Sequence, residues 1–184
     1  VTLHILPAAH FAMAENGAAP VKVTPVVTDL SSRRCEVTVE AFVAGADTVC
    51  FALDGQQTSA PVENGTAKAV FTLENAHLWD GLDDPYLYTL TAALDNGESQ
   101  SVRFGCRKFE IDPQKGFLLN GRSYPLRGVS RHQDRKGVGI AITKEMMEED
   151  LALILEMGAN TIRLAHYQHA QTFYDLCDEK GLVI

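Results

Sequence analysis

The pattern of hydrophobic residues changes near residue 106, and this change most constrains what the chain can fold into. Before it, short segments alternate between apolar and polar residues and are separated by turn signals. In residues 34–43 the apolar positions share one face; they are Cys35, Val37, Val39, Ala41 and Val43. Alternation of this kind is typical of half-buried strands, so the first part is predicted to be an antiparallel β-sandwich.

Pairs of asparagine or aspartate with glycine predict where this first part turns. Such pairs adopt the positive φ angles that two-residue hairpins need. They occur at Asp54–Gly55, Asn64–Gly65 and Asn96–Gly97. The strands predicted beside them are 48–53, 67–73 and 86–94.

After residue 106 the pattern predicts strands that alternate with helices. The predicted strands are 109–111, 117–119, 126–130, 160–165 and a last one that begins at residue 182. Thr143 is expected to cap a helix that Gly158 ends, and a second helix is expected to end at Gly181. Strand–helix–strand repeats indicate right-handed βαβ units on a parallel sheet. A complete (β/α)₈ barrel needs about 250 residues, so a truncated barrel is predicted.

Charge is distributed unevenly along the chain. Residues 18–105 carry twelve acidic and five basic side chains, a balance of −7, whereas residues 106–184 carry eleven of each. Phosphate binding needs clustered lysine and arginine, so an acidic first part argues against a nucleic-acid partner. The sequence also lacks a run of about 18 apolar residues, and no membrane partner is predicted.

The cysteines and the first residues bear on redox chemistry and compartment. No CxxC spacing occurs among Cys35, Cys50, Cys106 and Cys177, which argues against a zinc knuckle. Free buried thiols are expected.

Residues 1–7 alternate like a strand and lack the basic start of a signal peptide. We therefore expect a piece of a longer protein, and the choice between cytoplasm and periplasm stays open.

Several motifs resemble one enzyme family when they are taken in order. The segments are 84–88 (DPYLY), 104–111 (FGCRKFEI), 126–134 (LRGVSRHQD) and 157–167 (MGANTIRLAHY). They resemble family 2 of the glycoside hydrolases, and the segments around His132 and His166 resemble its β-galactosidase branch. Ser130 stands where the family usually has asparagine, a departure whose consequence the sequence leaves open.

The resemblance implies a mixed fold, in which an immunoglobulin-like β-sandwich is followed by the first βα units of a truncated (β/α)₈ barrel. Residues 1–17 would be the tail of a preceding jelly-roll domain of the sugar-binding type. Residues 18–106 would be the sandwich, and residues 107–184 the N-terminal part of a TIM-barrel catalytic domain.

Geometry and resemblance select the same candidate site residues. Ser130, Arg131 and His132 lie at the end of one predicted parallel strand, while Arg163 and His166 lie at the end of the next. Such strands lie about 4.8 Å apart. Barrel enzymes place their sites at these C-terminal strand ends, so His132, Arg163 and His166 are expected on one edge. By resemblance, Arg163 contacts the catalytic nucleophile and both histidines hydrogen-bond the sugar.

The resemblance also implies a retaining mechanism that uses two glutamates. Both are expected on later barrel strands, beyond Ile184, so no catalytic residue is predicted in this chain. The chain alone is therefore expected to be inactive. The expected partner of the longer protein is a β-galactoside-type carbohydrate, and self-association into a homo-oligomer stays open.

Other functions remain open at this level. Arg163 could pair with an acidic neighbour, and a histidine at a strand end is often structural. His132, His166 and His169 could hold a metal, but they lack a clear ligand spacing, so no cofactor is predicted here and a metal in the longer enzyme stays open. Two alternative functions remain. One is another β-glycosidase, such as a glucuronidase or mannosidase, and the other is a non-catalytic sugar-binding or interaction module.

Overall fold

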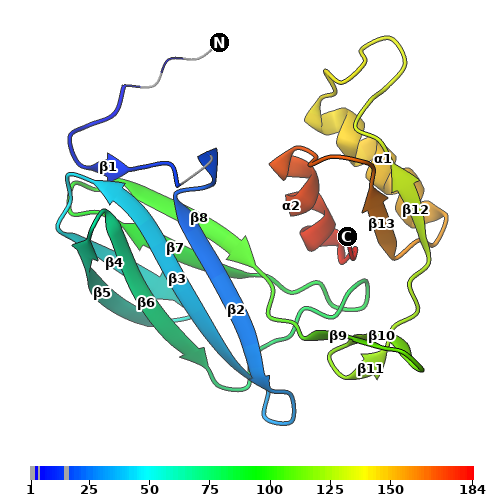
Figure 1. Cartoon of the computed structure of the whole chain (residues 1–184), viewed down its shortest axis with the longest axis horizontal. Helices are drawn as coiled ribbons and strands as arrows, with labels where there is room; N and C mark the ends of the chain where they lie inside the picture. The colour runs from blue at the N-terminus through cyan, green and yellow to red at the C-terminus, as the bar shows by residue number, and fades with distance from the viewer. Residues whose placement is uncertain (1–2, 4, 15–16) are drawn as a thin grey trace. The chain divides into compact units, whose positions relative to one another are not determined.

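The computed structural model describes residues 3, 5–14 and 17–184. The chain divides into two compact units, each with its own core (Figure 1). The first comprises Val1–Ala76 and Tyr88–Cys106, and the second comprises His77–Leu87 and Arg107–Ile184. Residues 77–87 lie within the range predicted for the sandwich, yet they make their contacts in the second unit. No helix among the described residues is long and apolar enough to cross a membrane.

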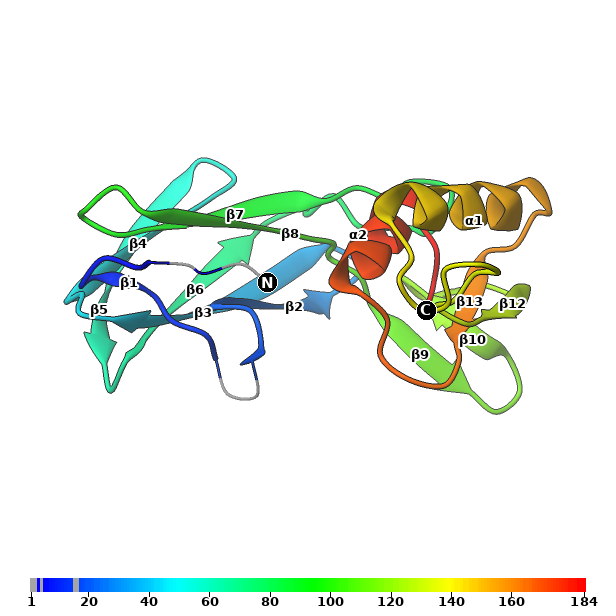
Figure 2. The same cartoon turned by 90° about the horizontal axis from the view of Figure 1, so that it is seen from above.

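The first unit is an antiparallel sheet folded into two layers, as the sequence predicted. Its path runs β1-β3-β6-β5-β4-β7-β8, with β2 on β3, and Figure 2 shows β4 and β7 in one layer and β2 and β3 in the other. The strands are β1 (His10–Phe11), β2 (Val21–Asp29), β3 (Arg34–Ala44), β4 (Thr48–Leu53), β5 (Gln56–Glu63), β6 (Thr66–Leu73), β7 (Tyr88–Ala93) and β8 (Ser99–Phe104). β5 joins the layers, because it pairs with β4 first and with β6 at its last two residues.

The core of the sandwich confirms the predicted inner face of β3. Alternate side chains of this strand are fully buried: Cys35, Val37, Val39 and Ala41 are all 0% exposed. β4 contributes Val49 and Phe51 to the same core. Cys50 lies between these two residues and is exposed, so the expectation of four buried thiols is wrong for Cys50. Strand alternation explains the difference, since neighbours of inward residues point outward.

Two of the three predicted hairpin turns form as expected. Both residues of Asp54–Gly55 and of Asn64–Gly65 have positive φ, between 49° and 77°. At Asn96–Gly97 only the glycine has positive φ, and β7 and β8 are joined by the longer segment 94–98. The Asn96 side chain accepts from the Glu98 backbone N–H at 2.9 Å and donates to the Ala9 carbonyl at 2.8 Å. The Ala9 contact links this longer loop to a distant segment of the chain.

The sequence prediction missed β2, and the strand that it placed at residues 1–7 is not found in the described part of that segment. β2 pairs only with β3 and contains Pro25, which is tolerated at a sheet edge but weakens the strand signal. The strand predicted for residues 1–7 falls partly on residues 1, 2 and 4, which lie outside the described residues. Residues 3 and 5–7 are not in a strand. The assignment of residues 1–17 to a preceding domain stays a prediction.

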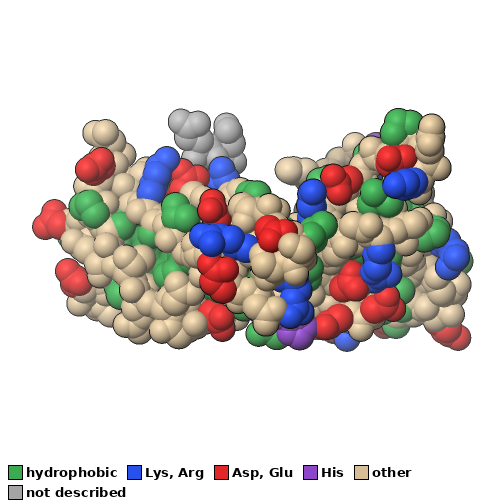
Figure 3. All heavy atoms as spheres, turned by 90° about the horizontal axis from the view of Figure 1, so that it is seen from below, with side chains coloured by type: hydrophobic (Ala, Val, Ile, Leu, Met, Phe, Trp, Pro, Cys, Tyr) green, Lys and Arg blue, Asp and Glu red, His purple; other side chains and the backbone are tan. Residues whose placement is uncertain are grey.

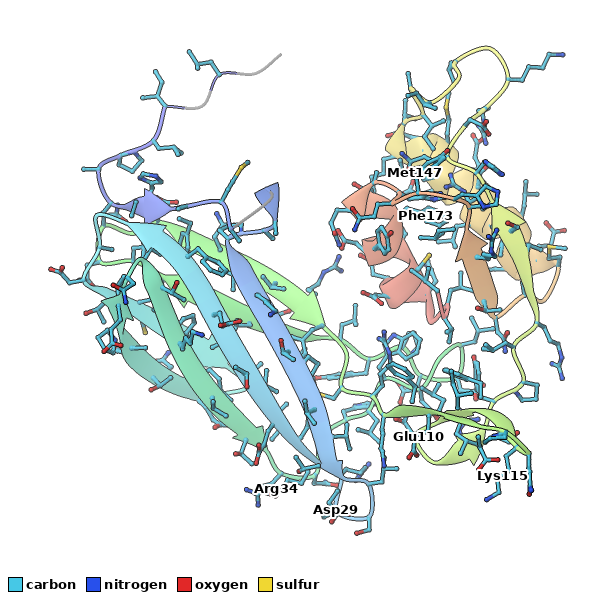
Figure 4. The ribbon with its side chains drawn as sticks, in the orientation of Figure 1. Asp29, Arg34, Glu110, Lys115, Met147 and Phe173 are labelled. Atoms are coloured by element: carbon cyan, nitrogen blue, oxygen red, sulfur yellow. The ribbon has the colours of Figure 1, made fainter. Side chains whose placement is uncertain are left out.

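Asp29 closes the turn between β2 and β3, near Arg34 (Figure 4). Its carboxylate accepts from the hydroxyls of Ser32 at 2.6 Å and Ser31 at 2.7 Å, and from the Ser31 backbone N–H at 2.9 Å. These bonds, the Ser32 hydroxyl first, lower the pKa of Asp29 from its usual 3.8 to about 2. Hydrogen bonds to an ionised carboxylate favour the charged form.

A depressed pKa in the folded state predicts a specific acid dependence. The contribution of Asp29 to stability should be complete above pH 3.8 and lost as the pH falls toward about 2. Carbon-detected NMR titration of the Asp29 carboxyl group should give the low midpoint directly. In an Asp29→Asn control the turn should show no titration in this window. An Asp29 midpoint at or above 3.8 would contradict the assignment.

The second unit combines an antiparallel sheet, a parallel strand pair and two helices. Its elements are β9 (Phe109–Asp112), β10 (Gly116–Leu119), β11 (Arg122–Ser123), β12 (Gly128–Arg131), α1 (Lys144–Glu156), β13 (Thr161–Leu164) and α2 (Gln171–Lys180). β12 and β13 are parallel, which confirms the predicted strand–helix–strand order. The strand expected from residue 182 is reduced to one parallel bridge between Thr161 and Val183.

The predicted helix ends agree with the structure. The Thr143 hydroxyl accepts from the Met146 backbone N–H at 3.4 Å and caps α1. Gly158 follows α1 with φ 80° and Gly181 follows α2 with φ 77°. Met147 of α1 and Phe173 of α2 point into a shared core in Figure 4.

Acidic and basic side chains are interspersed over the face of the molecule that Figure 3 shows.

Gly128 allows β12 and β13 to approach each other closely. It lies opposite Thr161, and a methyl group at this glycine would collide with the Thr161 side-chain methyl and carbonyl oxygen. We expect Gly128→Ala to destabilise the second unit by about 1–3 kcal/mol, as other overpacking substitutions do. Denaturant unfolding would measure this effect. Adding Thr161→Ser should recover part of the loss, because it removes the methyl but not the carbonyl. No recovery would exclude the collision with the Thr161 methyl as a cause.

Candidate functional site

The candidate site lies where β12 and β13 end. The two strands are in parallel register, with Ser130 opposite Arg163 and Arg131 opposite Leu164. The Ala165 backbone N–H donates to the Arg131 carbonyl at 2.9 Å, so the two strands stay adjacent up to their C-terminal ends. The residues at the ends of both strands therefore share one edge. We call Ser130, His132, Arg163 and His166 the strand-end site.

Arg163 connects the two halves of the strand-end site. Its Nη1 donates to the Ser130 hydroxyl at 3.4 Å, and its Nη2 donates to Nδ1 of His166 at 3.1 Å. A guanidinium can only donate, so Nδ1 of His166 must accept. A neutral His166 ring then carries its proton on Nε2, and this N–H is the donor that the ring offers to a ligand.

His132 completes the group. Its ring centre is 5.2 Å from that of His166, and the two rings are nearly perpendicular at 80°. Tyr167 lies beside His132 with ring centres 6.5 Å apart, and its hydroxyl accepts from the Gln133 backbone N–H at 3.1 Å. The side chains of His132, Arg163 and His166 are exposed. The structure therefore brings together the three residues that the sequence selected; their roles stay predictions.

Arg163 differs in its partners from three other arginines of this unit. Arg122, Arg131 and Arg135 each pair with aspartate at 3.0 Å or less. Within the described part of the chain, Arg163 has only a hydroxyl and an imidazole as hydrogen-bond partners and forms no ion pair with a carboxylate. A guanidinium held by neutral groups keeps its charge available for an anionic group.

The three-histidine metal site that the sequence left open does not form. His169 is buried at 6% exposure and faces Arg131, whereas His132 and His166 are exposed. Among the residues that the structure describes, no group of three or more histidine, cysteine, aspartate or glutamate side chains could hold a metal ion.

Sequence reasoning missed the residues that support the site from beneath. The Gln133 side chain accepts from the Ala170 backbone N–H at 2.6 Å, and Asp150 of α1 pairs with Arg131 at 2.7 Å. Asp150 had a usable signal, because it lies three residues after buried Met147 and directly before buried Leu151. A carboxylate on the inner side of a helix needs a buried partner.

Comparison with known proteins finds two family models that match consecutive parts of the chain. The family model described as "Glycosyl hydrolases family 2" matches residues 9–107, and that described as "Glycosyl hydrolases family 2, TIM barrel domain" matches residues 109–184. A β-glucuronidase of Bacteroides fragilis is 47% identical over 115 residues, which cover 60% of this chain and 16% of that protein. The β-galactosidase BoGH2A of Bacteroides ovatus is 36% identical over 152 residues, which cover 74% of this chain and 18% of that protein.

A solved structure extends the likeness over nearly the whole chain. The crystal structure of an FMN-binding β-glucuronidase from Faecalibacterium prausnitzii L2-6 is similar with a TM-score of 0.85 and 39% identity. The match covers 96% of this chain and 29% of that chain. This chain thus spans less than a third of the length of each of these proteins. Because the first family model alone matches more than half of the residues, the chain belongs to family 2 of the glycosyl hydrolases.

Proposed function

We propose that a longer protein containing this chain is a retaining β-glycosidase, and that this chain supplies its sandwich and part of its sugar site. The observation that carries the proposal is Arg163, a cation at the ends of two parallel strands with neutral partners only. Sites of barrel enzymes are built at this end of the strands. An arginine in this position suits an anionic catalytic group.

Retaining glycosidases use two carboxylates about 5–5.5 Å apart, one as nucleophile and one as acid and base. In the proposed mechanism Arg163 faces the nucleophile, keeps it ionised and holds its orientation. His132 and His166 donate to sugar hydroxyls, and these bonds accelerate the reaction to the extent that they strengthen in the transition state. The two carboxylates come from barrel strands that this chain does not include.

Glucuronides are the first substrate class to test. The sequence motifs favoured a β-galactoside, but the relative reported above at 47% identity is a β-glucuronidase, and the β-galactosidase is 36% identical. These identities support the alternative that the motifs had ranked second. The two substrates differ at C5, which carries a carboxylate in a glucuronide and a hydroxymethyl group in a galactoside, and in the configuration of the C4 hydroxyl. A β-galactoside therefore remains the second candidate.

Chromogenic β-glucuronide, β-galactoside and β-mannoside, assayed side by side, would test the proposal. A longer protein that contains the chain should cleave one of them and release the sugar first with its β configuration, which NMR detects. The 184-residue chain alone should cleave none. Turnover by the chain alone that is lost on changing one of its own carboxylates would contradict the proposal. Sugar binding by the longer protein without turnover would favour the non-catalytic alternative.

A further inference from the structure

A partly buried polar network adjoins the strand-end site. Arg131 is only 6% exposed, and its Nε and Nη2 both donate to one oxygen of Asp150, at 3.1 and 2.7 Å. The other Asp150 oxygen accepts from Arg135 at 3.0 Å. The Arg131 guanidinium also lies 4.0 Å from the ring centre of Phe173. We call Asp150, Arg131 and His169 the Arg131 network.

His169 links this network to the second strand. Its Nδ1 lies 3.2 Å from Nη1 of Arg131, and its Nε2 lies 3.5 Å from the Ala165 carbonyl. Arginine can only donate and a carbonyl can only accept, so the ring accepts at Nδ1 and donates from Nε2. Only the neutral ring with its proton on Nε2 satisfies both contacts.

The surroundings of His169 favour this neutral form. Burial lowers the pKa of His169, and the nearby charge of Arg131 and His132 lowers it further, against the opposing effect of the Ala165 carbonyl. The ring is packed between Tyr167 and Phe173, with ring centres 5.3 and 6.0 Å away. A ring enclosed in this way has one arrangement that pairs both nitrogens.

The network includes or contacts the two residues that directly precede the site histidines. Arg131 comes directly before His132, and Ala165 comes directly before His166. We propose that Arg131 and His169 are positioning residues, which hold the backbones before His132 and His166 so that the two imidazoles face the same ligand. The catalytic meaning of this inference rests on the proposed function, whereas the contacts that support it are independent of that function.

Stability alone is a poor explanation for such a network. Buried ion pairs lose much of their attraction to desolvation, and apolar side chains of similar size often stabilise as well or better. The network instead supplies directional contacts to two separate strands. Directional hydrogen bonds can orient a side chain in a way that apolar packing cannot.

The tautomer of His169 can be measured in the 184-residue chain itself. Two-dimensional NMR of ¹⁵N-labelled imidazoles should show His169 neutral and protonated only at Nε2 near pH 7. The same sample should show a through-space contact between the His132 and His166 rings, whose centres are 5.2 Å apart. A His169 ring that is charged, or protonated at Nδ1, would overturn the proposal.

Arg131→Met and Arg135→Met form a matched pair of variants. Both remove an arginine that bonds Asp150, but only Arg131 contacts His169. Arg131→Met should give mixed His169 tautomers and abolish the His132–His166 contact, whereas Arg135→Met should preserve both signals. Equal spectra for the two variants would refute the positioning role.

Two substitutions of His169 test the network if Arg131→Met fails to fold. Glutamine can keep the donor to the Ala165 carbonyl, whereas asparagine can keep only the acceptor for Arg131. His169→Gln should therefore retain more of the His132–His166 contact than His169→Asn, and the reverse order would overturn the proposal.

In the longer protein, His169→Asn should lower kcat about 100-fold, which is the loss expected from a small misplacement of catalytic groups. Loss of the NMR contacts without loss of turnover would refute positioning, whereas intact contacts in a protein without turnover would refute only the proposed function.

Discussion

Replacing Arg163 with alanine in the longer protein should lower kcat/KM about 100- to 1,000-fold, or about 2.7–4 kcal/mol of transition-state stabilisation. The proposed nucleophile would lose the cation that keeps it ionised and oriented. His166 would lose the donor to its Nδ1, which now lies 3.1 Å from Arg163. Steady-state kinetics on the preferred glycoside would measure the loss, and circular dichroism would establish that the fold is intact.

Arg127→Ala is the matched control for this experiment. Arg127 is also an exposed arginine, but it precedes β12 and so lies at the opposite end of that strand from the site. Its replacement should leave kcat/KM within about twofold, as expected for a surface substitution away from the site. His132→Ala and His166→Ala should also lower kcat/KM, as Arg163→Ala does. Wild-type kinetics in all three site variants would show that the strand-end site is not the sugar site.

Phe51→Ala should destabilise the sandwich by about 3–5 kcal/mol, because it empties a fully enclosed volume. Phe51 lies on β4 and is 0% exposed. Because the sandwich has its own core, amide exchange should accelerate throughout the first unit and much less in α1 and α2. Denaturant unfolding followed by exchange mass spectrometry would measure both effects.

Val70→Ala is the control for the loss of a hydrophobic side chain. Val70 lies on β6 of the same sandwich and is 63% exposed, so its replacement should change stability by less than about 0.5 kcal/mol. Equal effects of Phe51→Ala and Val70→Ala would be incompatible with the described core. An equal rise in exchange across both units would show that they unfold as one.

Local sequence signals predict both helices and several strands, but not β2. Alternation along residues 34–43 identified the inner face of β3, and Thr143, Gly158 and Gly181 marked the helix ends. These signals depend on residues that are close in the chain, so they survive without knowledge of the fold. Parallel strand order then placed His132, Arg163 and His166 on one edge.

Contacts between distant residues decided what the sequence left open. Asn96 binds Ala9 from a loop that is longer than a two-residue turn. The segment 77–87 joins the second unit because the Trp79 indole donates to the Asp178 carbonyl and Asn120 donates to the Trp79 carbonyl.

The support beneath the site is also a product of the tertiary structure. The sequence groups His169 with His132 and His166 as one possible metal site, but the His169 ring faces Arg131, whose charge is balanced by Asp150. The partners in this network are 19 and 38 residues apart in the chain. The sequence by itself thus determined both helices, several of the strands and the candidate edge. Only the tertiary structure decided which polar groups pair, because pairing depends on distances that packing of the whole unit sets.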